Sequence, residues 1–387
     1  MESSHIETPA RTESVAVPSA VVSPQSVVSP QHGTTRSFRK PCAHPANSLT
    51  AHFPARDFIT GHDFQVAHCE QCGFDVTTPQ PGPVEMAGYY PNGYYGGVED
   101  RRFPHIVETL QNALYTLRVR EVEAVANSGP GRVLDVGCGR GVLLQEFRRR
   151  GWEVQGTELS EAAASYARQT LKIPVEIGDL ESIGFPPNYF DAITLWHVLE
   201  HVANPRALLA DIHRILKPDG VLLVAVPNFG SLEARISKDK WFHLDVPRHV
   251  THFSQVTLEQ ALYESGFDIR HTSGFAPEYD FFSFIQSALN LCGLRHNLLY
   301  DIVRGKQAKV LSGEPAPWWQ TAASVVLGAA LGILSVPATL VAGFTGQGGT
   351  VSMLAIKPSK PSAYSETAWS VLTPELKRRL AQPEGGP

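Results

Sequence analysis

Glycines at alternate positions, directly after an apolar β-branched run, constrain the fold of this chain more than any other feature. Residues 133–136 are Val-Leu-Asp-Val, and Gly137, Gly139 and Gly141 follow before a helical pattern begins. Such a turn lets backbone N–H groups approach a ligand with no Cβ in the way. The next expected strand, residues 153–158, ends in Glu158, about 20 residues further on, where a carboxylate can accept hydrogen bonds from both hydroxyls of a ribose. The pattern predicts a nucleoside-containing ligand at the carboxyl end of a parallel sheet.

The spacing of the glycines indicates which nucleoside. Dinucleotide-binding folds use G-x-G-x-x-G, whereas the third glycine here comes one residue earlier, so a nicotinamide oxidoreductase is the least favoured class. A third expected strand ends at residues 177–180, where Asp179 can accept a hydrogen bond from an exocyclic amine such as that of adenine. Residues 189–195 predict a fourth strand, which begins Tyr-Phe-Asp.

These motifs, in this order, resemble the class I S-adenosylmethionine-dependent methyltransferases over about residues 105–275. The resemblance implies an α/β fold with a doubly wound, Rossmann-like seven-stranded sheet, and S-adenosylmethionine as cofactor. It implies that Asp135 supports the loop and meets the methionyl amine, while Glu158 holds the ribose and Asp179 the adenine. The implied cofactor site comprises Asp135, Gly137, Cys138, Gly139, Gly141, Glu158, Leu159, Asp179, Leu180 and Trp196.

Composition shifts along the chain predict six parts. Residues 1–35 carry few large apolar groups and are expected to be a disordered tail. The parts that follow are a small module with an aromatic linker (36–100), the cofactor-binding core (101–275), an apolar helical insertion (276–349), a final core strand (350–357) and a C-terminal tail (358–387).

Cysteine and histidine in the small module have metal-ligand spacing. Cys69 and Cys72 form a C-x-x-C followed by glycine, a knuckle that can present two thiolates to Zn²⁺. Cys42 and His44 are the best candidates for the other two ligands, and free thiols are the alternative. The segment resembles the zinc-ribbon regions that precede some bacterial small-molecule methyltransferases, which implies a structural zinc and a cap over the active site.

The segment after the fourth strand carries ionisable residues. His197, Glu200 and His201 are spaced to share one helical face. The segment resembles one that borders the methionine end of the cofactor in this superfamily. In ubiquinone-type O-methyltransferases it holds divalent-metal ligands, the first of them acidic, but the first position here is His197. Catalysis by His197 and hydrogen bonding within the scaffold are the two interpretations.

A second candidate region follows the fifth strand, at residues 241–253. It resembles a Pro-Arg-His-x-x-x-Phe segment of methyltransferases that act on small molecules and glycans. His249 is predicted to be a base or to orient the substrate, since histidine can take a hydroxyl proton near neutral pH. Asp245 and Arg248 are expected to position it. The alternative is that His249 and Arg248 only lock the loop onto the sheet.

The insertion has no charged residue between Glu314 and Lys357, and residues 321–344 are long enough to cross a bilayer. Residues 350–356 are expected to return to the sheet, which disfavours a single membrane span. Two interpretations remain: a buried helical hairpin broken at Pro337, and a shallow, re-entrant or in-plane membrane contact through residues 281–345.

Net charge and cysteine content limit the kinds of partner and the cellular compartment that can be expected. A net charge of −5 gives no general case for nucleic-acid binding, and five scattered cysteines suit a reducing compartment. The first residues show no apolar signal segment, so a cytoplasmic protein is expected, peripheral at the inner face of the membrane if the insertion meets lipid.

The expected acceptor is a hydroxyl of a small molecule, sugar or lipid-linked intermediate. C-methylation of a nucleotide sugar, and a non-catalytic cofactor-binding protein that docks a membrane assembly, are the alternatives. The sequence does not indicate the oligomeric state.

Overall fold

The computed structural model describes residues 42–90, 105–126, 129–304 and 316–360, all within a compact unit that spans residues 38–387. The expected N-terminal tail (1–35) and nearly all of the expected C-terminal tail lie outside these described residues.

The predicted seven-stranded α/β sheet is confirmed. Its order is β10-β11-β8-β7-β4-β5-β6, with the strands β4 (Arg132–Val136), β5 (Glu153–Glu158), β6 (Val175–Ile177), β7 (Phe190–Trp196), β8 (Leu216–Pro227), β10 (Asp268–Ser273) and β11 (Thr350–Ile356). The strands from β8 across to β6 run parallel. The expected final strand, β11, pairs antiparallel with both β8 and β10. The carboxyl ends of the parallel strands therefore share one edge, where the predicted site residues follow them.

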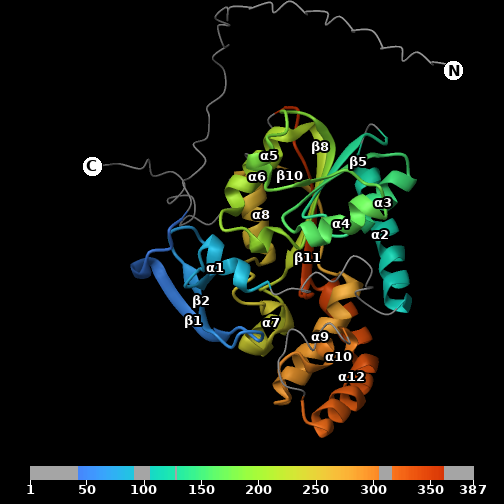
Figure 1. Ribbon diagram of the computed structural model, residues 1–387. Helices are drawn as coiled ribbons and strands as arrows, with labels where there is room; N and C mark the ends of the chain where they lie inside the picture. The colour runs from blue at the N-terminus through green and yellow to red at the C-terminus, as the bar shows by residue number, and fades with distance from the viewer. Residues whose placement is uncertain (1–41, 91–104, 127–128, 305–315, 361–387) are drawn as a thin grey trace, which may run out of the picture. The chain divides into compact units, whose positions relative to one another are not determined.

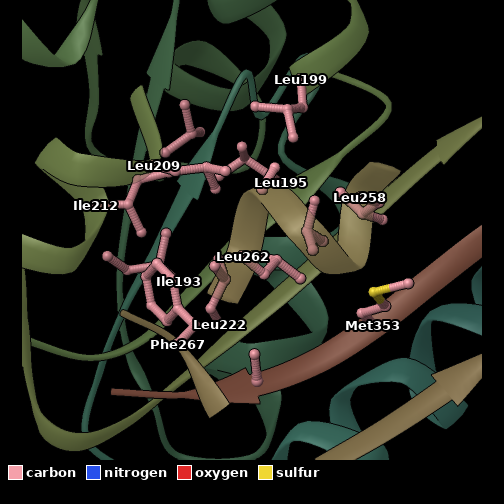
Figure 2. Close-up of a cluster of buried hydrophobic side chains, with 14 of the residues drawn as sticks. Ile193, Leu195, Leu199, Leu209, Ile212, Leu222, Leu258, Leu262, Phe267 and Met353 are labelled. Carbon is pink, nitrogen blue, oxygen red and sulfur yellow. The ribbon is translucent and has the colours of Figure 1, made fainter. Parts of the chain in front are cut away.

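Side chains that alternate along the strands enter two apolar cores, one on each face of the sheet. Helices α6 (Pro205–Ile215) and α8 (Gln255–Glu264) cover one face, where Leu209, Leu262 and Phe267 meet strand residues (Figure 2). Helices α2 (His105–Val125), α3 (Val142–Arg149) and α4 (Glu161–Gln169) cover the other. The short helix α5 (Leu180–Ile183) follows β6. This two-faced coverage explains why the central strands are apolar throughout.

A second sheet joins the N-terminal module to the core. Strands β1 (Leu49–Arg56), β2 (Asp63–Cys69) and β3 (Asp75–Thr78) form an antiparallel sheet, flanked by the short helices η1 (Ala46–Ser48) and α1 (Pro83–Gly88). Its fourth strand is β9 (Thr251–His252), which belongs to the loop after β8. The predicted small module is thus completed by two residues of the predicted catalytic region.

Short helices shape the loops at this edge: η2 (Leu199–His201) follows β7, while α7 (Leu232–Ser237), η3 (Lys238–Lys240) and η4 (Phe242–Leu244) follow β8. The insertion between β10 and β11 contains α9 (Pro277–Leu291), α10 (Leu298–Arg304) and α12 (Trp318–Phe344), which pack side by side (Figure 1).

The interpretation of residues 321–344 as a buried hairpin broken at Pro337 is wrong. Helix α12 continues through Pro337, and only 17% of its most apolar window is buried. Hydroxyl groups on both sides of the proline donate to backbone carbonyls, Ser335 to Gly332 (2.8 Å) and Thr339 to Ser335 (2.7 Å). These bonds satisfy the two buried hydroxyls within the helix. Among the described residues, α12 is the one helix long and apolar enough to cross a membrane.

Candidate active site

The glycine loop between β4 and α3 has one open position flanked by two close-packed ones. Gly137, Gly139 and Gly141 all have positive φ (68°, 52° and 71°). A Cβ on Gly137 would lie 2.6 Å from Val198 Cγ2, and one on Gly141 would lie 2.9 Å from Ala167 Cβ. A Cβ on Gly139 would meet no atom within 4 Å. The backbone is therefore accessible to a ligand at Gly139, while the outer glycines allow the loop to pack. Cys138 points inward, where its buried side chain packs against Gly156.

Glu158, at the end of β5, is oriented toward this loop. Its Oε2 accepts from the Gly139 N–H (2.9 Å), and its Oε1 accepts from the N–H groups of Leu159 (2.8 Å) and Ser160 (2.9 Å). These bonds fix the carboxylate beside the open glycine and leave part of its acceptor capacity for a ligand hydroxyl. The Leu159 side chain is 74% exposed and free to cover a ligand at this edge.

Asp179 follows the neighbouring strand β6. Its Oδ1 accepts from the Ser182 N–H at 2.8 Å and caps α5, and this backbone hydrogen bond lowers the pKa of the carboxyl. Because β5 and β6 pair with Glu158 opposite Ile177, the two acids lie at the same edge. Asp179 is exposed, whereas the next residue, Leu180, is buried in the core.

Asp135 lies inside the sheet edge, opposite Thr194 in the β4–β7 register. The Thr194 hydroxyl donates to its Oδ1 at 2.5 Å. Burial raises the pKa of Asp135 to about 7, and the threonine hydrogen bond opposes part of that shift. A buried carboxyl poised near neutrality is suited to meet a cationic ligand group.

Trp196, at the end of β7, is covered by a residue that the sequence analysis missed. The Arg118 guanidinium lies 3.5 Å from the centre of a Trp196 ring and forms an ion pair with Glu278 of α9. The Trp196 Nε1 is buried and has no partner among the described residues. Arg118 could be suspected from sequence only as a cation among the apolar positions of the helix over residues 105–125.

His197 lies at the same edge but before the helix η2, in a left-handed conformation with φ 55°. The expected shared helical face is therefore wrong, because only residues 199–201 are helical and in a 3-10 conformation. Its Nδ1 still lies 3.1 Å from Glu200 Oε1, and its ring centre is 4.4 Å from that of Tyr279. Burial lowers the pKa of His197 to about 3, and its Nε2 has no partner in the described part of the chain.

His249 and His201 lie near Glu200, and each has its Nδ1 against a backbone carbonyl. The Nδ1 of His249 lies 2.8 Å from the His243 carbonyl, and the Nδ1 of His201 lies 2.9 Å from the Arg248 carbonyl. A carbonyl oxygen only accepts, so both Nδ1 atoms carry the proton and both Nε2 atoms offer a lone pair. The His249 Nε2 is 3.9 Å from Glu200 Oε1, and the ligand atoms of all three residues lie within 4.8 Å of one another.

This trio can do two things chemically. Burial lowers the pKa of His249 well below its usual range and raises that of Glu200 to about 7, so the His249 imidazole is neutral and its Nε2 carries a lone pair. Two imidazoles with fixed tautomers and one carboxylate could also hold a divalent cation.

Arg248 and Asp245 tie the loop to the N-terminal module. The buried Arg248 Nη2 lies 2.8 Å from Asp57 Oδ1 and 2.6 Å from Asp245 Oδ1, and its Nη1 donates to the Tyr89 carbonyl at 3.1 Å. Burial disfavours ionisation of Asp245, but Arg248, His249 and His201 hold its pKa well below the usual range. Of the four predicted catalytic residues, His249 and His197 meet around Glu200, whereas Arg248 and Asp245 position the loop from behind. Asp57 carried no sequence signal for this role.

The four predicted metal ligands come together at the other end of the small sheet. The Sγ atoms of Cys42 and Cys69 lie 3.7 Å apart, as do Cys72 Sγ and His44 Nδ1. All four ligand atoms lie within 4.8 Å of one another. Two thiolates bound to one tetrahedral zinc at about 2.3 Å would be separated by about 3.8 Å, so the donor set fits this ion.

Comparison with known proteins agrees with this geometry. Residues 108–272 match the family model described as a methyltransferase domain. The ubiquinone biosynthesis O-methyltransferase of Pseudomonas aeruginosa (strain LESB58) is 33% identical over 119 residues, which is 29% of this chain and 51% of that protein. The protein of the same name from Maricaulis maris is 32% identical over 166 residues, or 39% and 65%. The chain thus spans between half and two thirds of the length of these relatives.

Two solved structures show partial similarity. A SAM-dependent methyltransferase from Archaeoglobus fulgidus is 19% identical with a TM-score of 0.39, and the match covers 64% of this chain and 94% of that one. The phosphoethanolamine N-methyltransferase 2 of Haemonchus contortus, in complex with phosphomonomethylethanolamine and S-adenosylhomocysteine, is 18% identical with a TM-score of 0.41. That match covers 65% of this chain and 53% of the other.

Proposed function

We propose that this chain, in which residues 108–272 are a class I S-adenosylmethionine-dependent methyltransferase domain, methylates a hydroxyl of a small molecule, sugar or lipid-linked intermediate. The observation that carries the proposal is the neutral, buried His249, held with its Nε2 lone pair available at the edge of the sheet that carries the glycine loop. The printed name O-methyltransferase of the relatives supports an oxygen acceptor. The proposal places the protein in the cytoplasm, at the inner face of the membrane.

The residues present fit the cofactor. S-adenosylmethionine, when bound, supplies an electrophilic methyl group on a sulfonium. Glu158 would hold the ribose hydroxyls beside Gly139, and Asp179 would accept from the adenine amine at the adjacent strand end. Asp135 would meet the methionyl amine, and Trp196, at the end of β7, has a buried Nε1 that lacks a partner among the described residues. Held by these residues, the cofactor would present its methyl group at the edge of the sheet where the acceptor must bind.

His249 then acts as the base. Its Nε2 would take the proton of the acceptor hydroxyl, and the cofactor would supply the methyl group that the acceptor oxygen receives. The Nδ1 bond to the His243 carbonyl keeps the ring in the reactive tautomer. Glu200, 3.9 Å from the Nε2, stabilises the imidazolium that forms.

Calorimetric titration of the purified full chain with S-adenosylhomocysteine tests the cofactor site. We expect saturable binding that weakens by about 10- to 100-fold in Glu158→Ala, because charge-assisted hydrogen bonds to the ribose are lost. Glu176→Ala, which removes an exposed carboxylate from the neighbouring strand, is the matched control and should bind like the wild type. Absence of binding to folded wild-type protein would contradict the proposal.

A second variant separates an enzyme from a cofactor-binding docking protein. His249→Asn keeps a donor for the His243 carbonyl but removes the Nε2 base. With an acceptor found by screening sugars and lipid-linked intermediates, we expect kcat to fall by about 10²- to 10⁴-fold with unchanged cofactor affinity. If wild-type turnover instead depends on added Mg²⁺ and stops with a chelator, a cation held by Glu200, His201 and His249 replaces the base mechanism. Equal turnover by His249→Asn and wild type would refute the assigned role.

A further inference from the structure

The polarity of α12 is inverted relative to a helix on a soluble core. The residues that it buries are small or polar: Ser324, Gly328, Ser335 and Thr339. Its large apolar side chains are exposed instead, and we call them the outward face: Trp318, Trp319, Val325, Val326, Leu327, Ile333, Leu334, Val336, Leu340, Val341 and Phe344. A core-facing helix buries its large apolar stripe and exposes its polar side. Small and polar residues at helix contacts, with apolar side chains outward, are typical of helices that face lipid.

Helix α9, which packs against α12, also buries polar side chains. The buried Gln286 of α9 donates to the Asn290 side chain at 2.8 Å, and Asn290 donates to the Asn297 side chain at 3.1 Å. Ser283 and Ser287, also buried on α9, donate to Glu233 of α7. These polar side chains of α9 are thus hydrogen-bonded within the protein, as a surrounding without hydrogen-bonding partners requires, whereas the buried Ser324 Oγ of α12 has no hydrogen-bond partner among the described residues.

The width and chemistry of the outward face select the kind of partner. At about 100° per residue, its side chains span roughly 200° of the helix circumference, whereas the four buried residues fall within roughly 60°. One packed helix or a protein groove covers a narrower stripe and adds polar groups at its rim. The outward face offers no charged groups for such a rim, since no charged residue occurs from residue 315 to 356. Lipid acyl chains, in contrast, can contact the whole width of the outward face at once.

We propose that the outward face of α12 docks into one leaflet of a lipid bilayer. Both ends of the insertion remain tied to the sheet, because α9 follows β10 and α12 leads into β11, which pair with each other. The exposed Trp318 and Trp319 at one end and Phe344 at the other are suited to the membrane interface. An in-plane orientation places the whole outward face in lipid without separating the two strands.

Helix α9 links the docked helix α12 to the active site. Helix α9, which packs against α12, also supplies Tyr279 beside His197 and Glu278 to Arg118. The site would therefore sit next to the membrane surface, which favours a lipid-linked acceptor; this last step rests on the proposed function.

Vesicle flotation of the full chain tests the docking without cofactor or acceptor. The protein is purified in mild detergent and diluted into phosphatidylcholine vesicles, alone or with a quarter phosphatidylglycerol. We expect flotation with both, and equal flotation in 0.1 and 0.5 M NaCl, because the outward face is uncharged. The double variant Val326→Glu, Ile333→Glu should lose at least about tenfold in vesicle partitioning. The control Val84→Glu, Val256→Glu places the same charges at equally exposed positions elsewhere and should float like the wild type.

Fold and function are measured in parallel on the same variants. Both double variants should keep the wild-type unfolding midpoint and S-adenosylhomocysteine affinity, since the substituted side chains are exposed. Wild-type protein that stays at the bottom of the gradient, or that binds only anionic vesicles at low salt, overturns the docking proposal. So does a discrete dimer, seen by light scattering, that the Val326→Glu, Ile333→Glu variant dissociates. Flotation without S-adenosylhomocysteine binding would instead overturn the proposed function and leave the docking intact.

Discussion

At the scale of single residues, Asp135 shows how burial gives a carboxylate its role. Thr194 is its hydrogen-bond partner, and burial raises the pKa of Asp135 to about 7. A fraction of the unliganded protein is therefore protonated at neutral pH, and a cationic methionyl amine favours the ionised form.

This pKa predicts a pH-dependent affinity. Binding of S-adenosylhomocysteine should release a proton near pH 7, and its Kd should rise by up to about tenfold for each pH unit below 7. The sign follows because the acid must ionise to bind. Titrations in two buffers of different ionisation enthalpy measure the released proton, and Asp135→Asn should bind weakly with a flat pH profile. A wild-type Kd that does not change between pH 5.5 and 7.5 would contradict this assignment.

The predictability of individual residues depends on where they lie along a strand. Asp135, Glu158 and Asp179 could be placed from sequence because each ends or nearly ends an apolar run, and parallel strands bring these ends to one edge. Arg118 and Tyr279 could not, since they lie on helices whose approach to the site depends on packing between distant segments.

At the scale of elements, the loop after β8 and the turn between β1 and β2 share one buried cation. Arg248→Met would leave Asp57 and Asp245 buried without their partner and should lower the free energy of unfolding by about 3–5 kcal/mol. Denaturant unfolding checks this value. Arg56→Met, which breaks the exposed ion pair with Asp63 on the same hairpin, is the matched control and should leave stability nearly unchanged. Similar losses of unfolding free energy in both variants would show that Arg248 does not specifically hold the loop after β8 to the turn between β1 and β2.

Element identity was more predictable than element burial. The last strand followed from a short apolar β-rich run at residues 350–356, and it returns to the sheet as expected; the structure places it between β8 and β10. The course of α12 did not follow, because a proline suggested a break and apolar composition suggested burial. Neither signal reveals that the neighbouring α9 offers polar side chains to pack against.

At the scale of the whole molecule, the Cys42, His44, Cys69 and Cys72 cluster lies at one end of the small sheet that pairs with the loop after β8. We propose that it holds one structural Zn²⁺. Elemental analysis should find about one zinc per chain, and removal by a chelator should lower the Tm and mobilise residues 241–253 through the β3–β9 pairing. Cys72→Ser should lose zinc, whereas Cys292→Ser, at an exposed cysteine outside the cluster, should retain it. Zinc-free protein with an unchanged Tm would rule out this role.

Because β3 pairs with β9, the small sheet cannot be completed during synthesis until residues 251–252 have left the ribosome. Asp75 and Val76 lie opposite His252 and Thr251, so a nascent chain exposes the edge of β3 until the ribosome has released residues far downstream. An open strand edge is a site of mispairing between chains. We therefore expect that truncated or stalled chains ending before residue 251 are held by chaperones or aggregate, and that the small module cannot be expressed alone as a stable unit.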